Sequence, residues 1–173
     1  ISVVSILLNI RKIKHIDADT DIYFSVFGVG KWYFIRIFAE KIMKEVIEFL
    51  DLIVVNNNRQ WFQEHKDMYL SAQERFNSVA EKVLRGIQGF DESVRSLTLR
   101  DCMYRFYRDT RFSMDKSPYK RHFGLFVCPG GKKSGLAGYY FHVEGKGAGY
   151  LGQHCLFSGI YQCEPFLAKS IRE

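Results

Sequence analysis

The sequence predicts an α+β domain: an antiparallel meander sheet with two N-terminal amphipathic helices packed on one face and a short C-terminal helix. Two observations predict this class. Apolar residues recur at helical spacing through residues 38–88, and aromatic or apolar runs of strand length follow between residues 103 and 156. The connections between these runs are short, which favours antiparallel neighbours, because a parallel pair needs a long crossover.

Two amphipathic segments form the helical part. The first ends near Val54, and its apolar residues share one helical face: Phe38, Ile42, Val46, Phe49, Leu50 and Ile53. The second runs from Arg59 to about Gln88, long enough for a bend or a second short helix. Three asparagines separate the two, with Asn57 and Gln60 as a candidate capping box. Both helices must cover one face of the sheet, since each would otherwise expose an apolar stripe.

Four strands are expected, at residues 103–108, 122–128, 138–144 and 149–156. The turn-rich sequences PGGKKSG and EGKG separate the last three strands. Near the end of the chain, Glu164-Pro165 places a proline where a first helical turn accepts it, and apolar residues continue a short helix. The segment 103–108 is predicted to be the first strand of the meander.

Residues 38–173 are predicted to form a single domain. We expect this domain to be truncated at the C-terminus, because its last helical pattern stops at Glu173, and the start at Ile1 also suggests a fragment. Residues 1–37 are interpreted as an extension of unclear status. Their apolar run, residues 1–10, precedes its cations and is shorter than the roughly 20 residues of a membrane span. We therefore expect no membrane association and a cytoplasmic protein.

Charge is concentrated in one stretch of the chain. Residues 101–133 contain eight Lys and Arg against three Asp, a local balance of +5 within a net charge of +6 for the whole chain. Aromatic residues are interleaved with these cations, so the segment is expected to be folded, because a disordered basic tail would be poor in aromatics. Three carboxylates cannot pair with eight cations, so the surplus is either solvated or available to a ligand.

The centre of this stretch predicts an anion site. Asp109-Thr110 suits the end of a strand and Ser117-Pro118 a turn, which leaves an ordered loop rich in hydrogen-bond donors. Guanidinium forks and hydroxyls suit phosphate or carboxylate oxygens. The candidate binding residues are Arg105, Arg108, Asp109, Arg111, Asp115, Lys116, Tyr119 and Lys120. If the site is catalytic, Asp109 or Asp115 would be the general base and Tyr119 the acid.

Three sequence blocks resemble an uncharacterised family. They are NNNRQWFQEHKDMY, YRDTRFSMDKSPYKRHFG and AGYYFHVE, and together they make the chain similar to the domain of unknown function 2461 family over roughly residues 42–172. The resemblance implies an α+β domain. It implies no activity, substrate or cofactor.

Alternative functions follow from the same residues. A basic sheet could bind nucleic acid if Tyr104, Phe106, Tyr139 and Phe141 stacked on bases. The segment could also be an ion-pair network in an interaction module without a ligand. Residues 56–59 either cap a helix or donate N–H groups to an anion, and capping is favoured.

Metal and nucleotide motifs are weak. Four cysteines form no C-x-x-C pair, and His122, His142 and His154 lie on different predicted strands without ligand spacing. The sequence PGGKKSG lacks the first glycine of a phosphate-binding P-loop, so it is interpreted as a hairpin loop. The sequence thus predicts no metal site and no cofactor.

Overall fold

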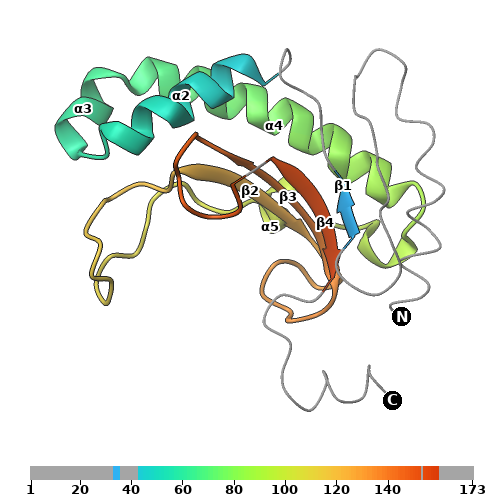
Figure 1. Cartoon of the computed structure of the whole chain (residues 1–173). Coiled ribbons are helices and arrows are strands. Elements are labelled where there is room, and N and C mark those ends of the chain that lie inside the picture. Colours follow the sequence, from blue (N-terminus) through green and yellow to red (C-terminus); the bar gives the residue numbers. More distant parts are fainter. Residues whose placement is uncertain (1–32, 36–42, 153, 160–173) are drawn as a thin grey trace.

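Four α-helices, a 3-10 turn and an antiparallel sheet form the described part of the chain, residues 33–35, 43–152 and 154–159, in a computed structural model. Helix α2 spans Lys44–Val55, α3 spans Arg59–Glu64 and α4 spans Lys66–Gln88. A 3-10 turn, η1, spans Glu92–Val94, and the single turn α5 spans Leu99–Cys102. Figure 1 shows α2 and α4 lying across one side of the sheet.

The sheet has the order β1-β4-β3-β2, with every neighbouring pair antiparallel. Its strands are β1, Tyr33–Ile35; β2, His122–Val127; β3, Gly138–Glu144; and β4, Cys155–Gly159. Consecutive strands β2, β3 and β4 pair as a meander, so the predicted α+β class and antiparallel sheet are confirmed. Strand β1 lies within the predicted extension, residues 1–37, and pairs with β4.

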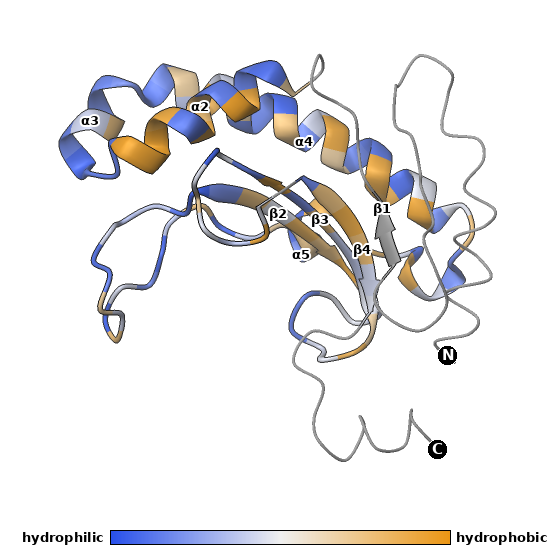
Figure 2. Cartoon of the chain, viewed as in Figure 1, coloured by the Kyte–Doolittle hydropathy of each residue, from blue (hydrophilic) through white to orange (hydrophobic). Residues whose placement is uncertain are grey.

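The core lies between the helices and the sheet. Phe76 of α4 packs against Phe123 of β2 and Phe141 of β3, with ring centroids 5.1 and 5.3 Å apart. Phe49 of α2 reaches the same cluster through Phe123. Figure 2 shows apolar and polar residues alternating along α2 and α4, as expected for helices with one buried face.

The long helical pattern is interrupted at His65. Its φ of −117° and ψ of 29° leave the helical region, so α3 ends there and α4 begins at Lys66. His65 Nδ1 lies 2.9 Å from the Trp61 carbonyl oxygen, and the Trp61 ring stacks on the imidazole. The structure therefore has the second short helix that the sequence allowed.

Among the described residues, one predicted strand does not form and another begins later than predicted. Residues 103–108 make isolated bridges, Met103 to Leu125 and Tyr107 to Tyr119, in place of a continuous strand. A bend at Phe106 turns its ring into the core that Met103 also contacts, and a spacing of three residues breaks strand alternation. The predicted strand 149–156 begins instead at Cys155, because Gly149 and Gly152 adopt positive φ and bend the chain.

Other predictions concern the ends of the chain. The first helix begins at Lys44 in the described residues, and residues 36–42 of its pattern lie outside them. The C-terminal helix predicted from Glu164 also lies outside the described residues. Residues 128–137 connect antiparallel β2 and β3, so the glycine-rich sequence there is a hairpin loop as predicted.

Candidate functional site

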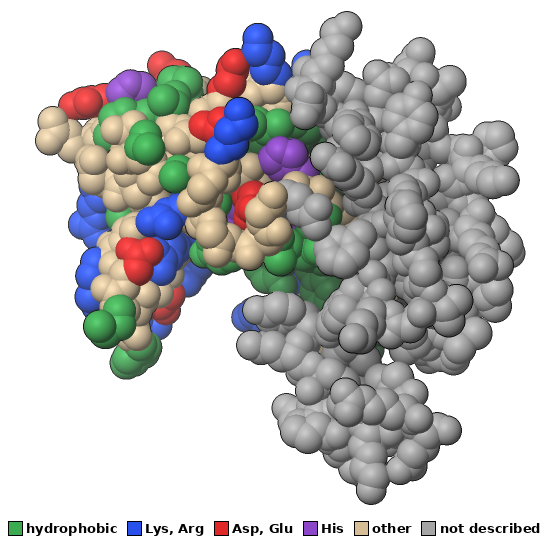
Figure 3. Space-filling view, in the orientation of Figure 1, with side chains coloured by type: hydrophobic (Ala, Val, Ile, Leu, Met, Phe, Trp, Pro, Cys, Tyr) green, Lys and Arg blue, Asp and Glu red, His purple; other side chains and the backbone are tan. Residues whose placement is uncertain are grey.

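Residues 103–108 run beside β2, at the edge of the sheet, and the chain then leaves the body as a loop. The Tyr104 N–H donates to the Gly124 carbonyl, and the Arg108 N–H donates to the Pro118 carbonyl at 2.9 Å. Residues 109–117 form the loop that the Arg108–Pro118 contact closes, and Figure 1 shows it projecting away from the helices and sheet. Lys and Arg side chains surround this loop in Figure 3, and hydrophobic side chains lie at its tip.

Arg108 organises the base of the loop. Its Nη1 donates to Asp115 Oδ2 at 2.6 Å and to the Ser117 carbonyl, while Nη2 donates to the Ser113 hydroxyl. Arg121 approaches the same Asp115 oxygen at 3.8 Å. The Arg108 side chain is 19% exposed. Its guanidinium group therefore mainly holds loop residues together through these hydrogen bonds.

Asp115 and Asp109 are both held ionised. Ser117 donates its hydroxyl and its N–H to Asp115, and with Arg108 these bonds keep the pKa of Asp115 far below its usual range. Arg111 forms a two-pronged pair with Asp109, at 3.0 Å from Nε and 2.7 Å from Nη2. These hydrogen bonds lower the pKa of Asp109 to about 2. At neutral pH both carboxylates are ionised and accept hydrogen bonds from neighbouring residues of the loop.

Tyr119 lies in the core, apart from the polar groups of the loop. Its side chain is 2% exposed and stacks on Phe62 with ring centroids 4.0 Å apart. Burial raises the pKa of its phenol. The backbone of Tyr119 is bonded on both sides by Asn57, whose amide donates to the Tyr119 carbonyl and accepts from the Tyr119 N–H, each at 3.0 Å.

Arg105 and Lys120 occupy a different place from the loop. Arg105 is exposed and forms no ion pair with any described residue. The Lys120 ammonium lies 5.1 Å from the centre of the Tyr104 ring, a cation–π contact. Burial, and then the charge of Arg105, lower the pKa of Lys120.

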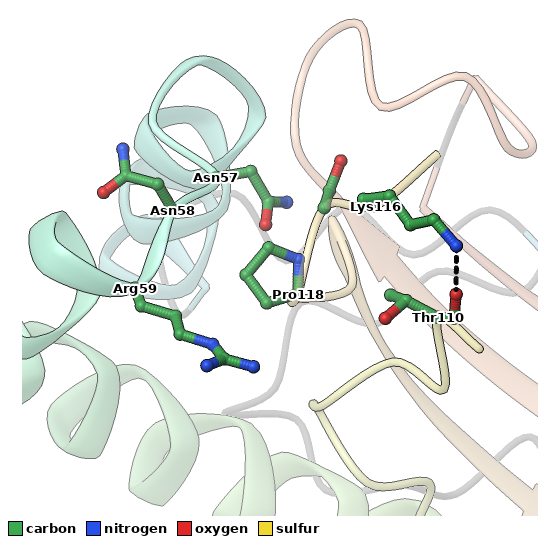
Figure 4. Close-up of a pocket in the computed structure, with 7 residues that line it drawn as sticks. Asn57, Asn58, Arg59, Thr110, Lys116 and Pro118 are labelled. Atoms are coloured by element: carbon green, nitrogen blue, oxygen red, sulfur yellow. Dashed lines mark hydrogen bonds between the residues drawn. The ribbon is translucent and has the colours of Figure 1, made fainter. Parts of the chain in front are cut away.

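An open pocket of about 450 Å³ lies between the start of α3 and the base of the loop. Its lining contains two cations and no carboxylate: Asn57, Asn58, Arg59, Thr110, Lys116, Ser117 and Pro118. Figure 4 shows Arg59 extending from α3 toward the loop that carries Pro118. The Lys116 ammonium donates to the Thr110 carbonyl at 3.1 Å, which leaves two of its three N–H groups for other acceptors.

The structure thus divides the eight predicted residues. Lys116 lines this pocket, while Arg108 and Asp115 brace the loop behind it and Arg111 pairs with Asp109. The residues predicted to bind an anion do not include Asn57, Asn58 and Arg59, because capping is the favoured interpretation of residues 56–59. Asn58 is indeed the cap of α3, accepting from the Trp61 N–H at 2.9 Å. The contact of Asn57 with Tyr119 spans 62 residues and leaves no local signal in the sequence.

A family model matches most of the chain. A model of the family described as conserved hypothetical protein (DUF2461) matches residues 45–173. The chain belongs to this family. The resemblance predicted from the three sequence blocks over residues 42–172 is thereby confirmed. Searches of curated proteins and of solved structures found no match.

The aromatic residues considered for base stacking in this DUF2461 chain mostly face the helices. Phe106, Tyr139 and Phe141 belong to the buried core cluster, and Tyr104 is partly buried beside Tyr140. The Tyr139 hydroxyl donates to buried Asp91 at 3.0 Å, and burial raises the pKa of that phenol. Among the described residues, no helix is long and apolar enough to cross a membrane.

The outer face of the sheet, the face turned away from α2 and α4, carries polar residues of this DUF2461 chain. Tyr140, His142 and Glu144 alternate along β3 with the core residues Phe141 and Val143. The Tyr140 hydroxyl lies 3.0 Å from His142 Nδ1, and His142 Nε2 lies 3.0 Å from Glu144 Oε2. The sequence signal for this hydrogen-bonded row is only the i, i+2 spacing of Tyr140, His142 and Glu144, which places all three on one face of a strand.

The histidines and cysteines of the described residues do not combine into a metal centre. In the part of the chain that the structure describes, no group of three or more His, Cys, Asp or Glu side chains could hold a metal ion. The described cysteines, Cys102, Cys128 and Cys155, are free and buried. Burial raises the pKa of Cys102 to about 11 and that of Cys155 to about 12, so neither is a thiolate at neutral pH.

Proposed function

We propose that this DUF2461 protein binds a small anionic ligand, bearing a phosphate or carboxylate group, in the pocket between α3 and the basic loop. One observation carries the proposal: cations from two separate elements, Arg59 and Lys116, line a pocket whose described lining contains no acidic residue. A bound anion would find a guanidinium fork on one side and an ammonium on the other.

Neither cation is neutralised by an acid. Arg59 and Lys116 form no ion pair with any residue in the described ranges. Arg108, Arg111 and Arg121 differ, since each lies within 4 Å of a carboxylate. Thr110 adds a neutral hydroxyl group to the pocket lining. Within residues 109–117, Lys116 is therefore a described cation without a carboxylate partner, and it lines the pocket.

The remaining predicted residues support the pocket indirectly. Arg108, Asp115 and the serines fix the loop that places Lys116, and Arg105 with Lys120 add positive potential along the same segment. The proposal is for ligand binding alone and includes no catalytic reaction. A nucleic acid would present the same phosphate chemistry, so an oligonucleotide is a second probe for the same pocket.

Thermal unfolding in inorganic phosphate tests the proposal. The double variant Arg59→Gln, Lys116→Gln should keep the melting temperature of the natural chain in chloride but lose the increase that 10-fold higher phosphate gives at constant ionic strength. Lys133→Gln is the matched control, because it removes a cation from the exposed β2–β3 hairpin loop. Equal phosphate responses in all three proteins, or none in the natural chain, would contradict the proposal. A larger response to single-stranded DNA would favour nucleic acid.

A further inference from the structure

The Tyr140–His142–Glu144 chain of hydrogen bonds lies on the outer face of β3, and its last two members are buried. His142 and Glu144 are 1% and 4% exposed. Glu144 Oε2 accepts from the Leu151 N–H at 3.1 Å as well as lying 3.0 Å from His142 Nε2. The residues 145–151 thus fold back on the sheet and fix the carboxylate, which in turn fixes the imidazole.

These contacts define which atoms donate. The Leu151 N–H can only donate, so the Glu144 oxygen is an acceptor, and as a carboxylate it also accepts the Nε2–H of His142. His142 Nδ1 then carries a lone pair, to which the Tyr140 hydroxyl donates at 3.0 Å. A carboxylate, an imidazole and a hydroxyl in this order form the arrangement by which proteins activate a hydroxyl group.

Room for the Tyr140 hydroxyl is made by the neighbouring strand. Gly124 of β2 faces His142 across the sheet, and a Cβ atom at Gly124 would lie 2.9 Å from the Tyr140 hydroxyl oxygen. Any larger residue would displace the hydroxyl from His142. Glycine at this position therefore has a specific steric role in the hydrogen-bonded chain.

A second, independent feature points to a ligand. His122 of β2 is 9% exposed, and its Nδ1 has no hydrogen-bond partner among the described residues. Its ring lies beside that of His142, with centroids 4.9 Å apart. A buried polar atom without a partner costs stability, so it is retained where something else completes it.

We propose that Tyr140 is the reactive group of an acid–base site on the outer face of the sheet, and that the site deprotonates a small weak acid. The phenol proton passes to Nδ1 of His142, and the imidazolium is stabilised by Glu144. The phenolate then takes the proton of the bound acid, which leaves as its conjugate base, and His142 returns its proton to water. No oxidant, reductant or other reactant is needed.

The surroundings suit this chemistry. Burial lowers the pKa of His142, so the imidazole is neutral and able to accept a proton at neutral pH. The edge of Tyr104 meets the Tyr140 ring, and the Lys120 ammonium lies over Tyr104. This cation favours a product that carries negative charge. The site shares no residue with the anion pocket, so either proposal can fail without the other.

Labelling with an aryl sulfonyl fluoride tests the proposal without knowledge of the ligand. The Tyr140 oxygen attacks sulfur, an O–S bond replaces the S–F bond, fluoride leaves, and the phenol proton goes to His142. Tyr107 is the internal comparator, because it is 49% exposed and its hydroxyl forms no hydrogen bond with a described residue. Peptide mass spectrometry should find Tyr140 labelled at least ten-fold faster than Tyr107, although Tyr140 is less exposed. A rate equal to or below that of Tyr107 would overturn the proposal.

Variants then assign the effect to the hydrogen-bonded chain. Gly124→Ala should push the hydroxyl away from His142, and Glu144→Gln should remove the charge behind the imidazole. Each should bring the Tyr140 rate to that of Tyr107 while Tyr107 itself is unchanged. The pH profile of the natural chain provides a readout that needs no variant. Its midpoint for Tyr140 should lie at least one pH unit below that for Tyr107, and coincident midpoints would refute activation by His142.

Discussion

Asn56, Asn57 and Asn58 are identical residues in a row, and each makes a different hydrogen bond. The Asn56 amide donates back to the Leu52 carbonyl at the end of α2, and Asn58 caps α3. Asn57 instead bonds both backbone groups of Tyr119, as a neighbouring strand would. The expected capping box of Asn57 with Gln60 is wrong, because Gln60 donates to Glu64 and the cap is one residue later.

Asn57→Ala should therefore destabilise the protein more than Asn56→Ala. Removing Asn57 leaves the N–H and carbonyl of Tyr119 without partners in a partly buried place, at a cost of about 2 kcal/mol. Asn56→Ala loses one exposed bond, at about 0.5 kcal/mol. Urea unfolding measures both free energies. Equal losses would mean that water replaces Asn57 at Tyr119.

His122 makes stability depend on pH. Burial, with the nearby His142 and Lys120, lowers the pKa of His122 from 6.5 to about 3 in the folded protein. Between pH 6.5 and 3 the unfolded chain binds a proton that the folded chain does not, so stability falls as the pH falls. One proton corresponds to a slope of about 1.4 kcal/mol per pH unit.

His122→Phe should flatten this acid dependence. The variant removes the titrating group, so the free energy of unfolding should change less between pH 7 and pH 4 than in the natural chain. A part of the slope should remain, because burial also lowers the pKa of His142. Urea unfolding at the two pH values gives the comparison. The same slope in both proteins would show that His122 is not protonated on unfolding.

At the scale of elements, the sequence predicts β2 and β3 well because their apolar runs are long and end in turn residues. Helices α2 and α4 show clear periodicity for the same reason. The errors fall where a local irregularity overrides the pattern. The bend at Phe106 turns an alternating run into a bridged loop, and positive φ at Gly149 and Gly152 delays β4. Such irregularities depend on tertiary contacts that periodicity does not contain.

Contact between β3 and α2 depends on Gly145, the residue after β3. A Cβ atom there would lie 2.5 Å from the Leu50 carbonyl oxygen and 3.0 Å from the Asp51 nitrogen, both backbone atoms of α2. Gly145→Ala should force the helix from the sheet and cost about 1–3 kcal/mol. Gly89→Ala is the control, since its Cβ would meet backbone at 3.3 Å. Thermal unfolding should show the larger loss for Gly145→Ala, and the reverse order would contradict this close packing.

At the scale of the whole molecule, the candidate sites were predictable only in part. The charge count drew attention to residues 101–133, which contain this loop, because charge counting needs no geometry. A charge count does not show which cations form ion pairs with carboxylates. Arg108 and Arg111 use carboxylates seven and two residues away, while Arg59 reaches the pocket from another element. The position of Gly124 beside the Tyr140–His142–Glu144 chain could not be predicted, because it depends on the register of β2 and β3.

Two phenylalanines, one in the body and one in the loop, should contribute very differently to the free energy of unfolding. Phe76 is fully buried between α4 and the sheet, whereas Phe112, at the loop tip, is 97% exposed. Phe76→Ala should cost about 3–5 kcal/mol, because it removes a large side chain and leaves a cavity. Phe112→Ala should change the free energy of unfolding by less than about 0.5 kcal/mol, because the tip contributes no core contact. Urea unfolding of both variants provides the test. A large loss for Phe112→Ala would place the loop tip against the body and would close the pocket that Lys116 lines.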